Sequence, residues 1–371
     1  MTRPKTNTRP TIPTPNRRTV LGGVAGASAA LGATRAHGAE PRTWKMVTSW
    51  PKGAPGVGTS AARLAAKINE MSDGRLTVTV YGAGELVPPF EVFDAVSSGT
   101  AEMGHGASHF WSGKDPAFSY FTGLPFGLMA HERIGWLEFG GGQALWDETY
   151  APFGVRAFFA GSSGVQAGGW FREPIISLDD FQGLKMRIAG LGGEVLRRLG
   201  VTVTLIPPSD IYGAMTSGAI DAAEWVGPWN DIAFGLSDVA KHYYLPAFHE
   251  PGPALECLVN ADAFAALPPD LQAIVQAAAG AAALESLGEF TFYNAQAFSS
   301  LDDLGVTVHT WPEDVVAAMR ATSDEVLQGL SEANELCARI HASYEAYRTK
   351  AVAYADASER EMLRLRVKNQ P

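Results

Sequence analysis

The sequence predicts an α/β protein of two domains or two lobes. Its 371 residues are 46% hydrophobic and 18% charged, a composition typical of a soluble globular chain of that size. A strand pattern over 43–50 is followed by helical residues over 59–71 and by a second strand pattern over 76–81. A strand–helix–strand order of this kind forms a parallel, right-handed unit of an open sheet.

The alternation of strands and helices continues through most of the chain. The segment over 165–171 is expected to be a long strand that crosses between the lobes, and a strand over 256–260 is expected to bring the chain back. The other expected strands cover 101–107, 155–160, 185–188, 201–206, 220–225, 242–248 and 306–311. The other expected helices cover 88–98, 131–139, 194–199, 211–217 and 262–285.

Residues 312–371 form a C-terminal helical segment. Between Pro312 and Lys368 the residues favour helix, with a single glycine and no further proline. Helices of that combined length are unusual for a compact lobe. Two arrangements remain open: helices that wrap the back of both lobes, or a projecting helix that mediates homodimer formation.

The N-terminal 39 residues have the features of an export signal. They hold six Lys or Arg and no Asp or Glu, and Arg17 and Arg18 precede an apolar run over 20–33. Small residues then surround Ala36 and Ala39, as at a cleavage zone, and paired arginines indicate the twin-arginine type. The run is too short for an ordinary membrane-spanning helix. The prediction is a signal peptide over 1–39 and a periplasmic protein; a disordered basic tail is the alternative.

The charge balance restricts the class of partner. Without residues 1–39 the chain has 23 Lys and Arg against 39 Asp and Glu, a net charge of −16, whereas the full chain carries −10. A surface this acidic argues against nucleic acid or an anionic membrane as a partner. An anionic ligand would therefore need a local concentration of positive charge.

Arg187 is the expected source of that charge. It stands at the end of a brief strand over 185–188, just before a glycine-rich turn over 190–193. Ligands of open α/β sheets bind where the carboxyl ends of strands meet the following loops. The planar guanidinium also suits a bidentate carboxylate. Arg187 is predicted to anchor a small organic anion, and a structural ion pair is the alternative.

Other polar and aromatic residues stand at expected strand ends. These are Gln166, Glu224, Trp225 and Trp170, together with His109 and Trp111 from the first lobe. An amide, a carboxylate and aromatic walls suit a small polar anion that is enclosed away from water. Glu224 beside an anion is explained if a hard cation takes oxygens from Glu224, Gln166 and the ligand. Alternatively, Glu224 pairs with Arg187, and the tryptophans pack in the core.

Catalytic motifs are weak in this sequence. There is no Gly-x-Ser-x-Gly elbow, and His105 and His109 have no recognisable orienting acid in the sequence around them. There is no Cys-x-x-Cys pair, and Cys257 and Cys337 can be bonded to each other or be buried free thiols. An exported lyase or isomerase acting on a small carboxylate, with one of these histidines as base, remains an alternative function.

The order of several segments resembles a known family. The signal is followed by Ser-Trp-Pro at 49–51, Gly-Leu-Lys-Met-Arg at 183–187 and Ser-Gly-Ala-Ile-Asp-Ala-Ala-Glu-Trp at 217–225. Together they resemble the extracytoplasmic solute receptors (DctP-type) of TRAP transporters over essentially the whole exported chain. The segments 113–116, 189–193 and 224–228 are most similar to the 2-oxo acid and monocarboxylate receptors. A departure is His109-Phe110, where that subgroup would have tyrosine-like residues.

The resemblance implies a periplasmic binding protein fold. Lobe 1 would comprise 40–163 with 253–311 and lobe 2 would comprise 164–252, joined by crossing strands and a hinge helix. Some members exchange a long C-terminal helix to form dimers, which would assign that role to 312–371.

The resemblance also implies a function without catalysis. The receptor would capture a pyruvate- or lactate-like acid through Arg187 and deliver it to the membrane permease. A Na⁺ or Ca²⁺ ion would be held by Gln166, Glu224 and the carbonyl of Trp225, with Glu250 as a further candidate. No organic cofactor is implied.

Overall fold

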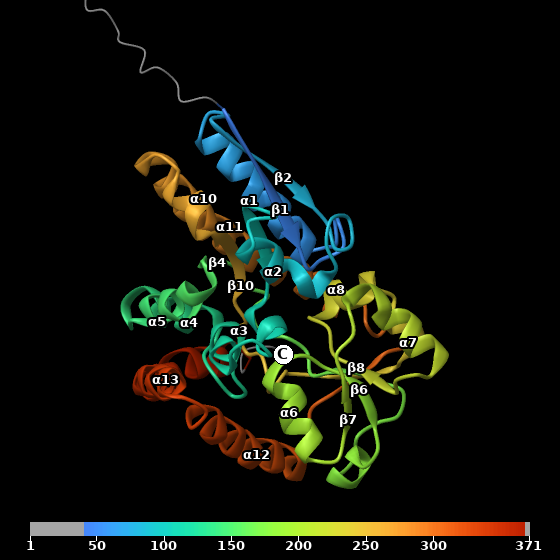
Figure 1. The fold of residues 1–371 in the computed structure, drawn as a ribbon. Coiled ribbons are helices and arrows are strands. Elements are labelled where there is room, and N and C mark those ends of the chain that lie inside the picture. Colours follow the sequence, from blue (N-terminus) through green and yellow to red (C-terminus); the bar gives the residue numbers. More distant parts are fainter. Residues whose placement is uncertain (1–40, 368–371) are drawn as a thin grey trace, which may run out of the picture. The chain divides into compact units, whose positions relative to one another are not determined.

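The computed structural model describes residues 41–367, and Figure 1 shows how the elements follow one another. The signal expected over 1–39 lies outside the described residues. Across 41–367, no helix combines the length and the apolar character that a membrane crossing requires. The fold is mixed α/β, as the sequence predicts, and its strands form two sheets.

The first sheet has the strand order β2-β1-β3-β10-β4. β1 (Arg42–Thr48) pairs in parallel with β2 (Leu76–Tyr81) and with β3 (Met103–Gly106). β10 (Leu255–Asn260) is antiparallel to both β3 and β4 (Val155–Gly161). The predicted parallel unit of β1, α1 and β2 is confirmed, because α1 (Val57–Met71) connects two parallel neighbours.

The second sheet has the strand order β11-β9-β5-β8-β6-β7. Its strands are shorter than the sequence predicts: β5 (Gly169–Phe171), β6 (Lys185–Arg187), β7 (Thr202–Thr204), β8 (Ala222–Ala223), β9 (His242–Tyr244) and β11 (Thr307–His309). The lobe bounds expected from the resemblance place residues 306–311 in lobe 1, whereas β11 pairs with β9 in the second sheet.

The prediction of a long strand over 165–171 is wrong for the first half of that segment, which has no regular strand pairing. Regular pairing begins only at Gly169, which has a φ of 127°, while Gly164 has a φ of 70°. These left-handed conformations interrupt a strand, and glycine is the residue that adopts them without steric cost. Backbone hydrogen bonds nevertheless hold this segment to the second sheet, since the amides of Ala167 and Gly168 donate to the carbonyl oxygens of Val226 and Tyr244.

One long helix contacts elements that belong to both sheets. α11 (Pro269–Phe298) packs on β4 and α1 beside the first sheet, and on α8 (Pro228–Ala233), which follows β8 of the second. It begins after Pro268, seven residues later than expected from the predicted start at 262, because the short α10 (Ala261–Ala265) precedes it. α11 therefore occupies the place of the predicted hinge helix.

The C-terminal helices wrap both halves, which is the first of the two predicted arrangements. α12 (Glu313–Ser331) packs on α6 (Gly190–Arg198), and α13 (Glu335–Ala355) packs on α4 (Ala130–Phe139) and α5 (Gly142–Tyr150). A π-helical turn (Asp356–Arg360) leads to α14 (Glu361–Val367), which exposes Met362, Leu363, Leu365 and Val367. The remaining helices are α2 (Val92–Ser97), α3 (Ser119–Thr122), α7 (Ile211–Ser217) and α9 (Leu236–Val239).

Two buried carboxyl groups each bind a tryptophan and a tyrosine. Glu256 accepts from Trp111 Nε1 at 2.8 Å and from the Tyr150 hydroxyl at 2.7 Å. Asp231 accepts likewise from Trp170 and Tyr243. Burial raises the pKa of Glu256 to about 8 and that of Asp231 to about 7, although these hydrogen bonds act to lower both.

These carboxyl groups are expected to make the protein less stable as the pH rises. The pKa of Glu256 in the folded state lies above its ordinary value of 4.5, so the folded chain keeps a proton that the unfolded chain releases. The resulting stabilisation is complete below about pH 4.5 and is lost as the pH rises through about 8. The free energy of unfolding measured in urea should therefore be lower at about pH 8.5 than at about pH 6.

The Glu256→Gln variant removes this titration. Its free energy of unfolding should fall less between the two pH values than that of the unmodified protein, whereas the exposed Glu91→Gln control should show the full decrease. An equal decrease in all three proteins would contradict the assignment.

Both cysteines are buried free thiols, which is one of the two alternatives that the sequence left open. Burial raises the pKa of Cys257, and it raises that of Cys337 to about 11.

Candidate ligand-binding site

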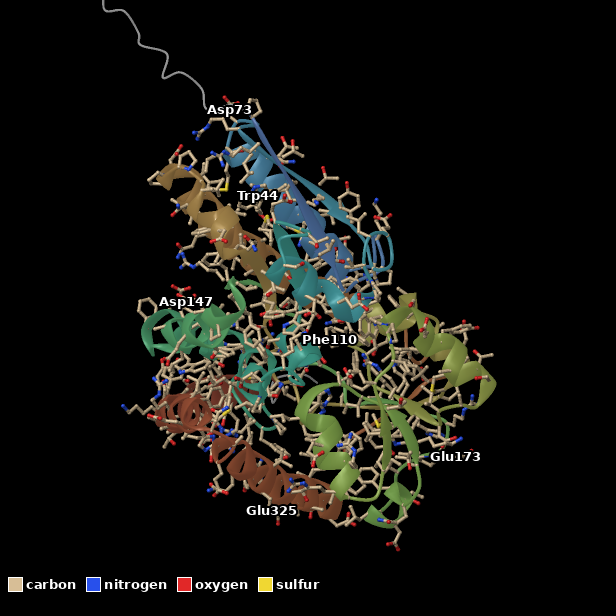
Figure 2. All side chains as sticks on the ribbon, in the orientation of Figure 1. Trp44, Asp73, Phe110, Asp147, Glu173 and Glu325 are labelled. Atoms are coloured by element: carbon tan, nitrogen blue, oxygen red, sulfur yellow. The ribbon has the colours of Figure 1, made fainter. Side chains whose placement is uncertain are left out.

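A small cavity lies where strands of both sheets end. Loop residues after β3 contribute His109 and Phe110, the crossing segment contributes Gln166, and residues at the ends of β6 and β8 contribute Arg187 and Trp225. Phe110 is labelled in Figure 2. The cavity has about 30 Å³ available to the centre of a water-sized molecule. This is about two to three times the least space that holds one water. The site therefore suits a ligand of a few heavy atoms.

Arg187 and Glu224 meet because their strands are parallel neighbours. β6 ends at Arg187 and β8 ends one residue before Glu224, so both side chains leave the same edge of the sheet. The Nη1 group of Arg187 donates to the carbonyl oxygen of Glu224 at 2.5 Å and to its Oε2 at 3.0 Å. Both side chains are at least 97% buried. The structural ion pair considered for Arg187 is therefore present, and it lies inside the cavity.

The guanidinium of Arg187 is held by aromatic contact as well as by charge. Its centre lies 5.5 Å from the Trp225 ring, within the range of a cation–π interaction. Burial lowers the pKa of Arg187, while the carboxylates of Glu224, Glu250 and Asp231 oppose that shift. Three acidic side chains surround this one buried cation, and their negative charges would repel an anionic ligand. Arg187 can therefore bind a small anion only if those acids are themselves neutralised.

Three buried polar atoms of the cavity residues have no hydrogen-bond partner within residues 41–367. They are Gln166 Oε1, Trp225 Nε1 and His109 Nδ1, and the last of these lies close to Glu250. The amide nitrogen of Gln166 donates to Ser163 Oγ at 3.2 Å, which leaves its oxygen as the acceptor facing the site. An unpaired buried polar atom costs about 1–3 kcal/mol, so a free acceptor and a free donor here point to a ligand that supplies both partners.

Glu250 is paired across the cavity with the first half of the chain. Its Oε1 lies 3.0 Å from His109 Nδ1, an ion-pair contact that lacks the alignment of a hydrogen bond. Burial raises the pKa of Glu250, but His109, His249 and Arg187 together lower it below its ordinary value. The carboxylate form is therefore favoured despite complete burial.

His249 is a polar residue beside the cavity that the sequence analysis missed. Its Nε2 lies 3.6 Å from Glu224 Oε1, an ion-pair distance that is too long for a hydrogen bond. Burial lowers the pKa of His249, but Glu224 and Glu250 outweigh that effect and raise it. Gly192 makes room for it, since a Cβ at Gly192 would stand 2.5 Å from the His249 Cβ.

The oxygen atoms gathered here fit a hard cation. The predicted ligands are the carboxylates of Glu224 and Glu250, the amide oxygen of Gln166 and the carbonyl of Trp225; all four residues line the cavity. Ca²⁺ and Na⁺ take oxygen ligands of these types, and the unpaired Gln166 Oε1 is available for one. Within 41–367 no metal-binding group of three or more His, Cys, Asp or Glu side chains occurs. The cation ligands expected here do not form such a group, because they combine only two carboxylates with an amide oxygen and a backbone carbonyl.

Two predicted site residues lie outside the cavity. Trp111 turns into the first core and donates to Glu256, and Trp170 stacks on Tyr243 and donates to Asp231. Each indole has found a buried carboxylate partner that is distant in sequence, by 145 residues for Trp111 and by 61 for Trp170. The alternative of core packing is therefore the correct interpretation of both.

Several cavity residues were not predicted. The aromatic wall includes Trp50 and Phe110, whose rings lie 5.8 Å apart, and Thr122 and Ser163 add hydroxyl groups. Trp50 follows the end of β1, so the strand-end criterion that found Arg187 could have found it. His249 has no such signal, because it lies in a loop five residues beyond β9.

His105, one of the two candidate bases, is buried against Trp50. The Trp50 indole donates to its Nδ1 at 2.8 Å, and burial lowers the pKa of His105 to about 3. His105 therefore stays neutral in a structural contact.

Comparison with known proteins decides the family. Residues 46–334 match the family described as bacterial extracellular solute-binding protein, family 7. The chain belongs to this family. The resemblance inferred from the sequence is confirmed, and so is the two-lobed α/β fold.

Similar proteins cover nearly the whole receptor. A monocarboxylate 2-oxoacid-binding periplasmic protein from Nostoc sp. is 41% identical over 316 residues, which are 85% of this chain and 86% of the relative. A TRAP transporter solute-binding protein from Bordetella bronchiseptica, solved with calcium and picolinate, is 36% identical with a TM-score of 0.87, over 89% of this chain and 98% of its own. Another from Pseudoalteromonas atlantica, solved with sodium and pyruvate, is 36% identical with a TM-score of 0.85, over 88% and 99%.

The family-7 chain is therefore a solute-binding receptor of a TRAP transporter and not an enzyme. The exported lyase or isomerase considered as an alternative has no support.

Proposed function

We propose that this receptor binds a small 2-oxo or 2-hydroxy monocarboxylate of the pyruvate or lactate type, together with Na⁺ or Ca²⁺. The observation that carries the proposal is Arg187, fully buried in a cavity that admits only a few heavy atoms. A guanidinium in that position offers paired donors to a carboxylate. The ligands named for the relatives from Nostoc, Bordetella and Pseudoalteromonas support the same class.

The other cavity residues would select the rest of the ligand. The unpaired Trp225 Nε1 is a donor that can meet a 2-oxo or 2-hydroxy oxygen. Trp50 and Phe110 form an apolar wall that suits a methyl group and leaves no room for a second charged end. Together these contacts would favour short monocarboxylates over dicarboxylates.

A bound cation would supply positive charge between the ligand and two acidic residues. Glu224, Glu250, Gln166 Oε1 and the Trp225 carbonyl would hold it. Without it, the carboxylates of Glu224 and Glu250 would both repel an anionic ligand.

Closure of the two lobes on the ligand would complete the binding site. Lobe 1 (40–163 with 253–311, apart from β11) and lobe 2 (164–252) would move about the crossing segments and α11. His109 reaches Glu250 from the other lobe, a contact of the kind that is available only when the lobes are closed. Ligand binding would thus shift the population towards the closed form, without a chemical step.

Thermal unfolding provides the direct test of this function. Pyruvate or lactate should raise the melting temperature, because ligand that binds only the folded state stabilises it by mass action. The shift should be larger with Ca²⁺ or Na⁺ than after chelation and dialysis into cation-free buffer. A shift only with dicarboxylates or sugar acids would overturn the ligand class, and no shift with any acid would overturn carboxylate binding.

Export and partners follow from the same proposal. A twin-arginine signal over 1–39 would deliver the receptor to the periplasm, where the membrane permease would receive the acid from it. Of the C-terminal segment 312–371, α12 and α13 pack on the same chain, so α14 would supply the dimerisation helix, and its exposed apolar residues, such as Met362 and Val367, support that role.

A further inference from the structure

A second and much larger cavity lies on α12 and α13, away from Arg187. It is a groove between these helices, the loop over 245–251 and the turn at Phe126; α12 and α13 run along the lower edge of Figure 1. The groove offers about 660 Å³ to the centre of a water-sized molecule, whereas the solute cavity offers about 30 Å³. Pockets that enclose small organic ligands span about 300–1000 Å³.

The walls of the groove are apolar, and its charged lining residues are both basic. Phe248, Trp311 and Met319 are among the apolar residues, and Arg320 and Arg348 are the charged ones. No acidic residue lines the groove within 41–367. Paired cations in an apolar groove contrast with the acidic surface of the exported chain and attract an anion locally.

The two arginines converge on a single residue. The guanidinium of Arg320 lies 4.1 Å from the centre of the Phe126 ring, and Arg348 Nε donates to the Phe126 carbonyl at 3.4 Å. Arg348 also contacts Glu345 at 3.3 Å, whereas Arg320 has no hydrogen bond or ion pair with another side chain of the described segment. Arg320 thus retains its donors for a ligand.

Phe126 holds an unfavourable backbone conformation at this place. Its φ is 52°, a region that bulky residues rarely adopt, and its amide donates to the Phe248 carbonyl at 2.7 Å. Strained residues of this kind concentrate at ligand sites, where the surrounding contacts compensate the strain.

We propose that this groove binds an amphipathic monocarboxylate, such as a medium-chain fatty acid, as a second ligand. The carboxylate would pair with Arg320 and Arg348, and the hydrocarbon chain would lie along Phe248, Trp311 and Met319. A ligand without the charge would lose the two guanidinium contacts, and one without the chain would lose the apolar contacts. The solute cavity is too small for such a ligand.

Isothermal titration of the receptor with n-octanoate tests the proposal. One molecule should bind per chain even when pyruvate is saturating, and 1-octanol should bind at least about tenfold more weakly. Arg320→Gln and Arg348→Gln should each weaken octanoate binding at least about tenfold. Arg339→Gln is the matched control, since it removes the same charge from α13 outside the groove. Val316→Trp, which fills the groove, should abolish binding.

Four results would overturn the proposal. They are the absence of octanoate binding at millimolar concentration, displacement of octanoate by pyruvate one for one, unchanged binding in both arginine variants, and conversion of a dimer into a monomer by Val316→Trp without any octanoate binding in the parent. The last would assign the groove to a second copy of the chain. Because the groove and the solute cavity share no lining residue, the results with octanoate alone and with the arginine variants do not depend on whether pyruvate is the transported solute.

Discussion

The Arg187→Ala variant is expected to bind pyruvate about 30- to 5000-fold more weakly than the unmodified receptor, a loss of about 2–5 kcal/mol. The ligand carboxylate would enter a buried cavity without its cation, and it would face Glu224 with no intervening guanidinium. Isothermal titration calorimetry in buffer containing Ca²⁺ measures the change directly.

Two further variants separate this loss from misfolding. Arg198→Ala removes an exposed arginine of α6 that pairs with Glu194, and it should leave pyruvate affinity unchanged. Arg187→Lys keeps the charge but removes the planar fork, so its affinity should lie between the two. Unaltered affinity in a folded Arg187→Ala protein would disprove the role of Arg187 as anchor.

Removal of Na⁺ and Ca²⁺ is expected to weaken pyruvate binding by about 100-fold or more. Two unit charges about 4 Å apart interact by about 4 kcal/mol near a protein surface, so loss of the cation's attraction for the ligand carboxylate is enough for an effect of this size. Titration after chelation, followed by restoration of each ion separately, also identifies the preferred cation.

Gln166→Ala tests whether the predicted oxygens hold the cation. It should raise the Ca²⁺ concentration needed for half-maximal pyruvate affinity, because it removes the unpaired Oε1 from the ligand set. Gln182→Ala, at an exposed position outside the cavity, is the control. If binding persists in cation-free buffer, Glu224 has a structural role as the partner of Arg187 and nothing more.

Strand ends account for the part of the site that could be predicted from the sequence. Arg187 and Glu224 follow short segments with a strand pattern, and parallel neighbours bring such residues to one edge. Gln166 was found by the same reasoning even though its segment is not a strand. The error in the strand assignment did not affect this prediction, because the segment still brings Gln166 to the cavity.

Residues whose role depends on distant partners could not be predicted. Trp111 and Trp170 were expected in the cavity, but each donates to a carboxylate far along the chain. His249 reaches the cavity region because Gly192 leaves space for it. Neither relation has a local sequence signal.

The sequence by itself determined the α/β class, the parallel unit around α1 and the position of Arg187 at a strand end that opens into the cavity. These features depend on periodicity and on residue type over short stretches of chain. The tertiary structure alone decided which tryptophans face the ligand cavity, that β11 joins the second sheet, and that α12 and α13 enclose a groove beside Phe126. These last features depend on contacts between residues that lie tens to hundreds of positions apart in the sequence. Such contacts are set by the packing of the whole chain and are not encoded in local secondary-structure propensity.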